Sequence, residues 1–271
     1  PQHISSAMLR ADSEDKMSLC VLVSSAASNL NKITEVAFDA AKEFLAPKSD
    51  SRDSSAWLQW ANECRSEFER SDAAIRAYEK VLSLDSQNAE AWFHYARLID
   101  NEDTHPAKVV EAFEQVVQFE FEEPKLQTYP WTRMGILLAE KLGEIQKAEA
   151  AFKTALTINP TDAWAWYQLG SLQSEHLGRL RDAENSFHNA LKFEPQSDLY
   201  WCELAELLIR DPGRLNEAIE AYNKAHAIAP DSELYLIRLA AALASKPQGL
   251  TEAEKLLRKA VSNHPTSRLL R

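Results

Sequence analysis

The fold is decided by one stretch of the chain, which reads WYQLGSLQSEHLGRLRDAENSFHNALKFEP over residues 166–195. In its first half, Trp166 and Gly170 stand four residues apart with a leucine between them, which is the spacing of one helix face. In its second half, Ala183 and Phe187 keep the same spacing, and another alanine follows three residues later. The stretch therefore predicts two helices joined by a tight turn.

The same pattern recurs along the 271-residue chain with a period of 35 residues. The tryptophan column consists of Trp57, Trp92, Trp131, Trp166 and Trp201, with Leu236 in the sixth place. The bulky column lies 21 positions later and consists of Tyr78, Phe113, Phe152, Phe187, Tyr222 and Leu257. The small-residue column consists of Ala61, Ala96, Gly135, Gly170, Ala205 and Ala240. Small residues let the two helices of a unit approach closely. Six units in the same register therefore predict six helical hairpins.

Both ends of each predicted helix carry suitable residues. A side chain that can cap the first helix precedes it at Asp53, Asn88, Asp162, Ser197 and Ser232, and Gln127 is the exception. Glycines that suit a left-handed turn fall between the two helices at Gly143, Gly178 and Gly213. Prolines close the last four units at Pro160, Pro195, Pro230 and Pro265.

The motif Trp-x-x-Leu-Gly, followed by Ala-x-x-x-Phe-x-x-Ala and then Pro, resembles the tetratricopeptide repeat over about residues 53–266. The resemblance implies an all-α fold, in which residues 53–271 form a right-handed solenoid of about six 35-residue helical hairpins. Residues 1–52 are expected to form an N-terminal helical hairpin, a degenerate repeat that caps the solenoid. The alternative is that they are the trailing end of a preceding domain.

The two ends of the sequence suggest a fragment. The chain begins with Pro-Gln-His instead of methionine, and Ser267 stands in the capping column four residues before Arg271. Solenoids normally end in a polar capping helix, because the last unit otherwise exposes its apolar face. We therefore expect a piece of a longer protein that is truncated at the start of a further repeat.

One unit is longer than the others. The step from Trp92 to Trp131 is 39 residues, and the four extra residues fall within 118–130, which contains Pro124 and Pro130. Because prolines stop helices, this segment is expected to be a tolerated loop. A bend between two groups of repeats and an acidic contact loop are the alternatives.

The composition argues against several classes of partner. The 30 basic and 41 acidic residues give a net charge of −11, which disfavours nucleic acid and anionic lipid. No apolar run approaches the roughly 20 residues that span a bilayer, so no membrane insertion is expected. Cys20, Cys64 and Cys202 are too widely spaced for a disulfide framework, which favours a cytoplasmic protein with reduced thiols.

The sequence gives no support for catalysis. The glycine-rich phosphate-binding motifs, the nucleophile elbow and the His-Glu-x-x-His zinc motif are all missing from it. The seven histidines are scattered without metal-ligand spacing, and Cys202 is expected to be a structural thiol. We therefore expect no catalytic residue, no metal site and no cofactor.

The resemblance also implies a concave groove, lined by the first helix of each hairpin, in which a peptide or a partner helix would lie. Positions two before, one after and five after the tryptophan column share a face distinct from the packed one. Leu199 and Leu234 are among these positions. The residues expected to bind a partner are Asn62, Phe93, Arg97, Tyr129, Thr132, Trp164, Tyr167, Ser171, Cys202 and Glu206. The aromatic members have the composition of binding hot spots, or alternatively they pack against the adjacent first helix.

The expected function is that of a non-catalytic protein–protein interaction module. It would act as an adaptor, scaffold or sensor that binds a protein or peptide. The alternative is a regulatory or target-sensing repeat segment of a larger signalling enzyme, such as an NTPase or a protease. A self-assembling scaffold is a third possibility, and the sequence leaves the oligomeric state open.

Overall fold

The computed structural model describes residues 47–48, 51–66, 71–101, 105–246 and 248–263. These residues form helices, turns and loops without a β-strand, which confirms the predicted all-α class. The chain divides into two compact units, Pro1–Thr104 and His105–Arg271. The predicted hairpin in residues 1–52 lies almost entirely outside the described residues, as does the predicted start of a further repeat at Ser267.

The first unit contains three described helices. They are α4 (Ser54–Ser66), α5 (Ser71–Leu84) and α6 (Ala89–Asn101). α4 and α5 form a hairpin, and α6 packs on α5. Tyr78 of the bulky column and Ala61 of the small-residue column are both fully buried, as their places in the repeat predict.

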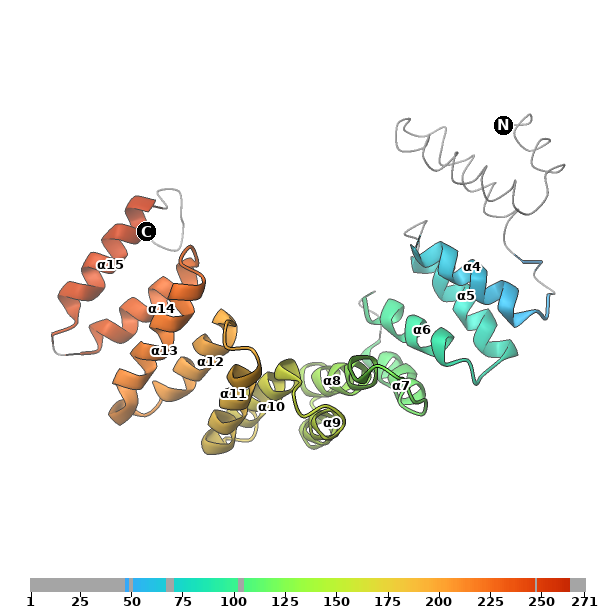
Figure 1. The fold of residues 1–271 in the computed structure, drawn as a ribbon, viewed down its shortest axis with the longest axis horizontal. Coiled ribbons are helices and arrows are strands. Elements are labelled where there is room, and N and C mark those ends of the chain that lie inside the picture. The colour runs from blue at the N-terminus through green and yellow to red at the C-terminus, as the bar shows by residue number, and fades with distance from the viewer. Residues whose placement is uncertain (1–46, 49–50, 67–70, 102–104, 247, 264–271) are drawn as a thin grey trace, which may run out of the picture. The chain divides into compact units, whose positions relative to one another are not determined.

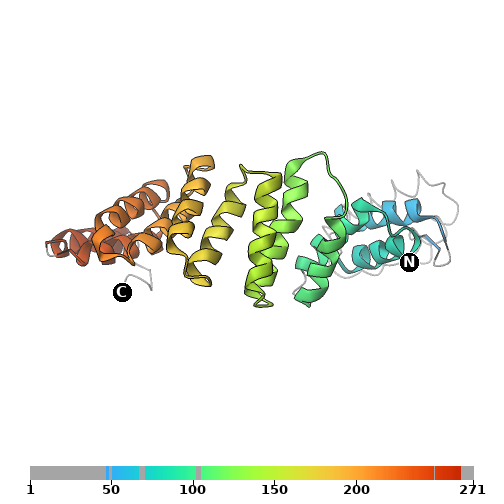
Figure 2. The same cartoon turned by 90° about the horizontal axis from the view of Figure 1, so that it is seen from below.

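The second unit is a row of hairpins. Its helices are α7 (Pro106–Val116), α8 (Pro124–Glu140), α9 (Ile145–Ile158), α10 (Ala163–Glu175), α11 (Leu180–Phe193), α12 (Asp198–Leu208), the short 3-10 helix η1 (Pro212–Arg214), α13 (Leu215–Ile228), α14 (Glu233–Ala244) and α15 (Leu250–Asn263). The hairpins α8–α9, α10–α11, α12–α13 and α14–α15 follow one another in chain order (Figures 1 and 2). We call the earlier helix of each pair its first helix and the later one its second helix.

The small-residue column is explained by the rings that face it within each hairpin. A Cβ atom added to Gly170 would lie 2.8 Å from the Phe187 ring, and one added to Gly135 would lie 2.5 Å from the Phe152 ring. Such distances are far shorter than van der Waals contact, so the phenylalanines sit directly on the glycine backbone. The predicted close approach of the two helices is confirmed at both positions.

The tryptophan column is held by one recurring hydrogen bond. The indole Nε1 of Trp166 donates to the carbonyl oxygen of Pro160 at 2.9 Å, and that of Trp201 donates to Pro195 at 3.0 Å. Trp92 makes the same bond to Ser86 in the first unit at 2.9 Å. Each of these three tryptophans therefore fastens its first helix to the turn six residues before it, which gives a reason for the residue to recur with the period.

Most of the predicted caps and turns are confirmed. Asp162 accepts a hydrogen bond from the amide of Ala165 at 3.1 Å, as a capping side chain should. Gly143 and Gly178 have positive φ angles of 69° and 62°. The prediction is wrong at two places, because Ser232 makes no capping bond and Gly213 lies in η1 without a positive φ.

The predicted loop at residues 118–130 is wrong in its second half. α8 starts at Pro124 and runs to Glu140, so the extra residues lengthen the helix at its start. Pro124 stands in the first turn, where a missing amide hydrogen costs nothing, and Pro130 lies inside the helix without ending it. Gln127 consequently lies inside a helix, which explains why it departs from the capping column.

Successive hairpins share one apolar core. Phe187 and Ala190 of α11 belong to the same buried cluster as Tyr200, Leu204 and Leu208 of α12. Each first helix in the second unit thus packs both on its own second helix and on the second helix before it. This double packing is what leaves only one face of each first helix for other contacts.

Candidate functional site

α10 carries a short stack of aromatic rings. The Trp164 and Tyr167 ring centroids are 5.1 Å apart, and the Tyr167 ring stacks on Tyr200 of α12 at 5.1 Å with 24° between the planes. Tyr200 is buried, Tyr167 is half-buried, and Trp164 at the outer end of the stack is 43% exposed. The stack therefore supports a tryptophan side chain that faces solvent.

Trp164 belongs to a row of apolar residues on the first helices, two positions before the tryptophan column. Leu199 of α12 and Leu234 of α14 occupy the same position in the next two hairpins. Leu234 is 49% exposed and Leu199 is half-buried. We call Trp164, Leu199 and Leu234 the first-helix row. Two exposed and one half-buried large apolar side chain, in register on three helices, are a feature of interaction surfaces.

Charged residues accompany this row. Arg238 of α14 forms an ion pair with Glu206 of α12, so Glu206 is already partnered across the two hairpins. Arg210, in the turn after α12, donates a hydrogen bond to the carbonyl oxygen of Ser174 of α10 at 3.2 Å. Burial raises the pKa of the Glu203 carboxyl, and the negative charge of Glu175 adds to the rise. The surface thus combines apolar anchors with paired and half-buried charges.

Three of the expected binding residues lie in the first unit. Asn62 accepts a hydrogen bond from the Tyr78 hydroxyl at 2.6 Å and donates one to Glu90 at 2.9 Å, so its side chain is occupied within the unit. Phe93 is buried at 7% exposure, and the Arg97 guanidinium lies 5.6 Å from its ring centroid. Among the three, Arg97 is the exposed one.

The other seven lie in the second unit with different degrees of exposure. Thr132 and Cys202 are buried at 4% exposure each, and the Thr132 hydroxyl donates to the carbonyl oxygen of Thr128 at 3.1 Å. Neither offers appreciable surface to a partner. Tyr129 is half-buried with its ring edge-on to Phe113, at 6.0 Å between centroids. The remaining members, Trp164, Tyr167, Ser171 and Glu206, are at least partly exposed.

Two residues of the site are not among those expected from the sequence. Tyr200 supports the aromatic stack, and Arg238 pairs with Glu206. The sequence contains a signal for Tyr200, because a bulky ring stands there in a column that two earlier units fill with alanine, at Ala91 and Ala165. For Arg238 the sequence shows only a basic residue 32 positions after an acidic one, which many surface charges would satisfy.

The described residues show little that suggests chemistry. Burial raises the pKa of the Cys202 thiol to about 11, so it is protonated and unreactive at neutral pH. The described part of the chain contains no group of three or more histidine, cysteine, aspartate or glutamate side chains that could hold a metal ion. Among the described helices, none has both the length and the apolar composition needed to cross a membrane.

Three family models, all described as tetratricopeptide repeat, match this chain. One matches residues 66–119 and 176–233, a second matches 151–185 and a third matches 130–162. Together they cover more than half of the chain. No curated protein sequence matches it.

Several solved structures have a similar fold. PilW, described as a type IV pilus biogenesis factor, has a TM-score of 0.60 and 22% identity, over 81% of this chain and 97% of its own. YrrB, described as a TPR protein with an unusual peptide-binding site, has a TM-score of 0.57 and 23% identity, over 70% and 93%. MamA from Desulfovibrio magneticus RS-1 has a TM-score of 0.56 and 20% identity, over 66% and 97%. At these identities the likeness establishes the fold.

Proposed function

The chain belongs to the tetratricopeptide repeat family, and from that premise we propose that its second unit is a non-catalytic module that binds a protein segment along its first helices. The surface would be the first-helix row, with Trp164 as the main anchor. The observation that carries the proposal is the exposure of Trp164, at 43%, on a ring stack that fixes its position. A rigid aromatic side chain that is half in solvent gains from burial and loses little conformational freedom on binding.

The row also indicates the kind of segment that would bind. Trp164, Leu199 and Leu234 are apolar, so the ligand needs apolar side chains that reach three successive hairpins. A charge beside the row is already partnered, since Glu206 forms an ion pair with Arg238. We therefore expect a peptide or helix whose affinity comes from apolar contacts more than from ion pairs.

The proposal predicts how selected ligands respond to substitution. Peptides that bind the wild-type chain would be selected from a random display library, and their affinities measured on variants. Trp164→Ala should weaken them by about tenfold or more, since truncating an interface hot spot costs roughly 2 kcal/mol. Leu234→Ala should give a smaller loss in the same direction.

A matched control is available on another face. Leu180 is 41% exposed on the second helix α11, close to the exposure of Trp164, and does not belong to the first-helix row. Leu180→Ala should leave the selected peptides unaffected. If it weakens them as much as Trp164→Ala does, or if neither change matters, the first-helix row is not the binding surface.

The absence of enzymatic activity and the cytoplasmic location remain parts of this proposal. Cys202 is free and buried, which supports a reducing compartment. The raised pKa of the Cys202 thiol supports a structural role for it. The module would act by holding its partner, and any chemistry would belong to that partner.

A further inference from the structure

A pocket of about 690 Å³ lies among α7, α8 and α9, on elements that contribute nothing to the first-helix row. Its volume falls within the range of roughly 300–1,000 Å³ that is typical of ligand sites. α8 packs on both α7 and α9, and it lines the pocket with Trp131, Met134 and Leu138. The pocket therefore has an apolar side that α8 supplies, between two second helices.

The pocket occurs where an ion pair that joins later hairpins is absent. Arg214, directly before α13, pairs with Glu184 of α11, and the equivalent pair joins the two second helices one period earlier. At the junction of α7 and α9, the column of the arginines holds Glu144 and the column of their partners holds Val110. Both residues line the pocket. An acidic side chain thus stands where the later hairpins supply an arginine.

A second cation is absent beside the half-buried ring of Trp131. In the hairpin of α12 and α13, the Lys224 ammonium lies 4.0 Å from the centroid of the Trp201 ring. The column of Lys224 holds Thr154 in α9, which lines the pocket together with Trp131. This column therefore provides Trp131 with no cation, although an indole ring attracts one.

The charges of the lining are unbalanced. Lys147 is the basic residue among them, and it forms an ion pair with Glu144. Glu111 and Glu114 lie three positions apart on α7, so they share one face of the helix, and both are exposed. Within the described part of the chain, neither carboxylate has a hydrogen bond or an ion pair. The pocket therefore attracts a cation.

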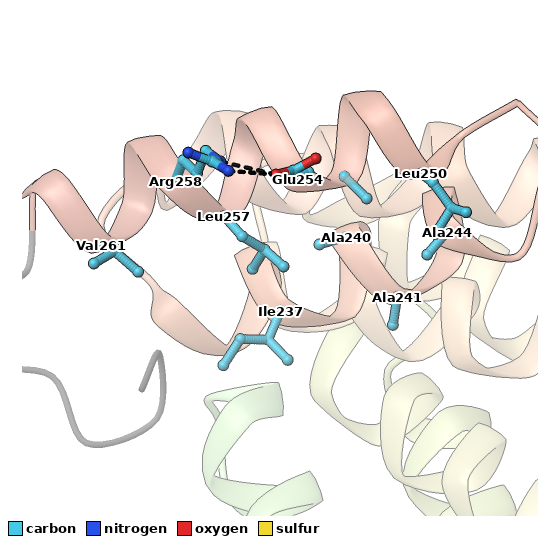
Figure 3. Close-up of a pocket in the computed structure, with 10 residues that line it drawn as sticks. Ile237, Ala240, Ala241, Ala244, Leu250, Glu254, Leu257, Arg258 and Val261 are labelled. Atoms are coloured by element: carbon cyan, nitrogen blue, oxygen red, sulfur yellow. Dashed lines mark hydrogen bonds and ion pairs between the residues drawn. The ribbon is translucent and has the colours of Figure 1, made fainter.

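The groove between α14 and α15 gives the opposite case (Figure 3). Its lining contains one acidic and one basic residue, Glu254 and Arg258, which pair with each other as the dashed lines show. The remaining lining residues are apolar. That groove carries no surplus charge that would select a ligand, whereas the pocket beside α7 carries two unpaired carboxylates.

We propose that the pocket among α7, α8 and α9 is a second binding site, which takes an arginine side chain from a segment of a partner protein. Glu111 and Glu114 bind the guanidinium, and the apolar side chains of α8 cover its aliphatic part. Arginine fits because its planar guanidinium both pairs with carboxylates and stacks on aromatic rings such as Trp131. The partner thereby supplies the positive charge that later hairpins supply themselves. The first-helix row has no part in this site, so the two can fail or succeed separately.

The probe is a display library of short random peptides that each contain one arginine. Peptides that bind the full wild-type chain would be counter-selected on the double variant Glu111→Gln, Glu114→Gln, which keeps the shape of both side chains. We expect peptides that bind the wild type and not the variant. Synthetic copies with citrulline in place of arginine should bind about tenfold more weakly or worse, because citrulline has the same shape without the charge.

Single substitutions separate the two carboxylates from a general effect of charge. Glu111→Gln and Glu114→Gln should each weaken the selected peptides by about threefold or more. Glu220→Gln is the matched control, because Glu220 occupies the column of Glu111 in α13 and is exposed as well. It should leave the affinity unchanged, and so should Trp164→Ala. In NMR titrations of the full chain, the indole signal of Trp131 should shift while that of Trp201 stays in place.

Three outcomes would overturn the proposal. The first is that no peptide distinguishes the wild type from the double variant, which is also the result expected if a segment of the chain itself fills the pocket. The second is equal binding of the citrulline peptides, which would mean that the positive charge is not recognised. The third is competition by free arginine at the concentrations at which the peptide binds, which would make a small cation the ligand.

Discussion

Arg214 donates hydrogen bonds to both carboxylate oxygens of Glu184, at 2.6 and 2.8 Å, and so ties the start of α13 to the second helix before it. One period earlier Arg179, which also directly precedes a second helix, lies 2.6 Å from Glu149. In the last hairpin these two positions hold Gly249 and Ile219, so the pair is not repeated there. The pair links two hairpins at the start of one second helix and within the second helix before it.

Arg214→Met should lower the free energy of unfolding by about 1 kcal/mol or less, because both side chains are partly exposed and screened. A double-mutant cycle with Glu184→Gln, measured by urea denaturation at low and high salt, isolates the coupling between them. The control is Arg258→Met, whose pair with Glu254 lies within α15 and is 80% and 61% exposed. An equal effect of both substitutions would mean that the link between hairpins contributes no more than an exposed ion pair within one helix.

The same pair gives a pH dependence with a defined sign. Hydrogen bonds from Arg214 hold the pKa of the Glu184 carboxyl below its usual range. The folded pKa is therefore lower than the unfolded one, so this stabilisation is present above about pH 4.3 and is lost as the pH falls through the folded value. Glu184→Gln should remove this part of the pH dependence of the free energy of unfolding. The measurement is urea denaturation between about pH 6 and about pH 3, a range that spans the unfolded and the folded pKa of Glu184.

Gly170→Ala should destabilise the protein by about 1–3 kcal/mol, because the new methyl group would lie 2.8 Å from the Phe187 ring in a packed core. Thermal or urea unfolding would measure the loss. Ala205 already occupies this column opposite Tyr222, so alanine is acceptable where the facing ring lies differently. The double variant Gly170→Ala, Phe187→Leu should therefore recover part of the lost stability, and a further loss would contradict the steric explanation.

Trp201→Phe should cost about 1 kcal/mol of stability, because it keeps an aromatic ring but removes the hydrogen bond from Nε1 to Pro195. The Lys224 ammonium also lies 4.0 Å from the centroid of the Trp201 ring, and a phenyl ring retains part of that attraction. Urea denaturation would give the difference, and hydrogen exchange at the start of α12 should accelerate. Unchanged exchange in α12 would show that this bond does not hold the helix to its turn.

His94 should make the first unit sensitive to acid. Burial lowers the pKa of His94 to about 4, and the positive charge of Arg65 acts in the same direction, while Glu90 opposes it. The folded pKa lies below the unfolded value of about 6.5. The free energy of unfolding is therefore highest above that pH, where His94 is neutral in both states, and it decreases as the pH falls toward 4. The loss amounts to about 2–3 kcal/mol.

The free energy of unfolding would be measured for the wild-type chain and for His94→Gln between about pH 7.5 and about pH 4.5. This range covers most of the interval between the unfolded and the folded pKa of His94. Glutamine does not titrate, so His94→Gln should lose less stability on acidification than the wild type. Parallel pH profiles for the two proteins would show that His94 is not the group responsible.

The repeat architecture follows from the sequence alone. Residues 35 positions apart share one environment, so a tryptophan, a small residue and a bulky ring in fixed columns are enough to predict hairpins of two helices. The pairing of Gly170 with Phe187, the cap at Asp162 and the left-handed turn at Gly178 all depend on neighbours within one unit. Local spacing therefore determines them.

The exposure of the candidate binding residues was decided by tertiary structure. Trp164 and Tyr167 are only three positions apart, yet Tyr167 is held under the Tyr200 ring while Trp164 faces solvent. Cys202 is buried although its column in the repeat predicts a free face. These outcomes depend on which side chains the neighbouring hairpin brings, and periodicity gives the position of a residue but not the size of its neighbour.

The long α8 and the link between Arg214 and Glu184 have the same origin. Whether Pro130 ends a helix depends on whether packing holds the chain helical around it, since only one backbone hydrogen bond is removed. Two charges 30 residues apart pair only when stacking sets the distance between hairpins. The sequence determined the repeating unit because its contacts are local, and the tertiary structure decided the surface because contacts between units depend on side chains that the repeat does not specify.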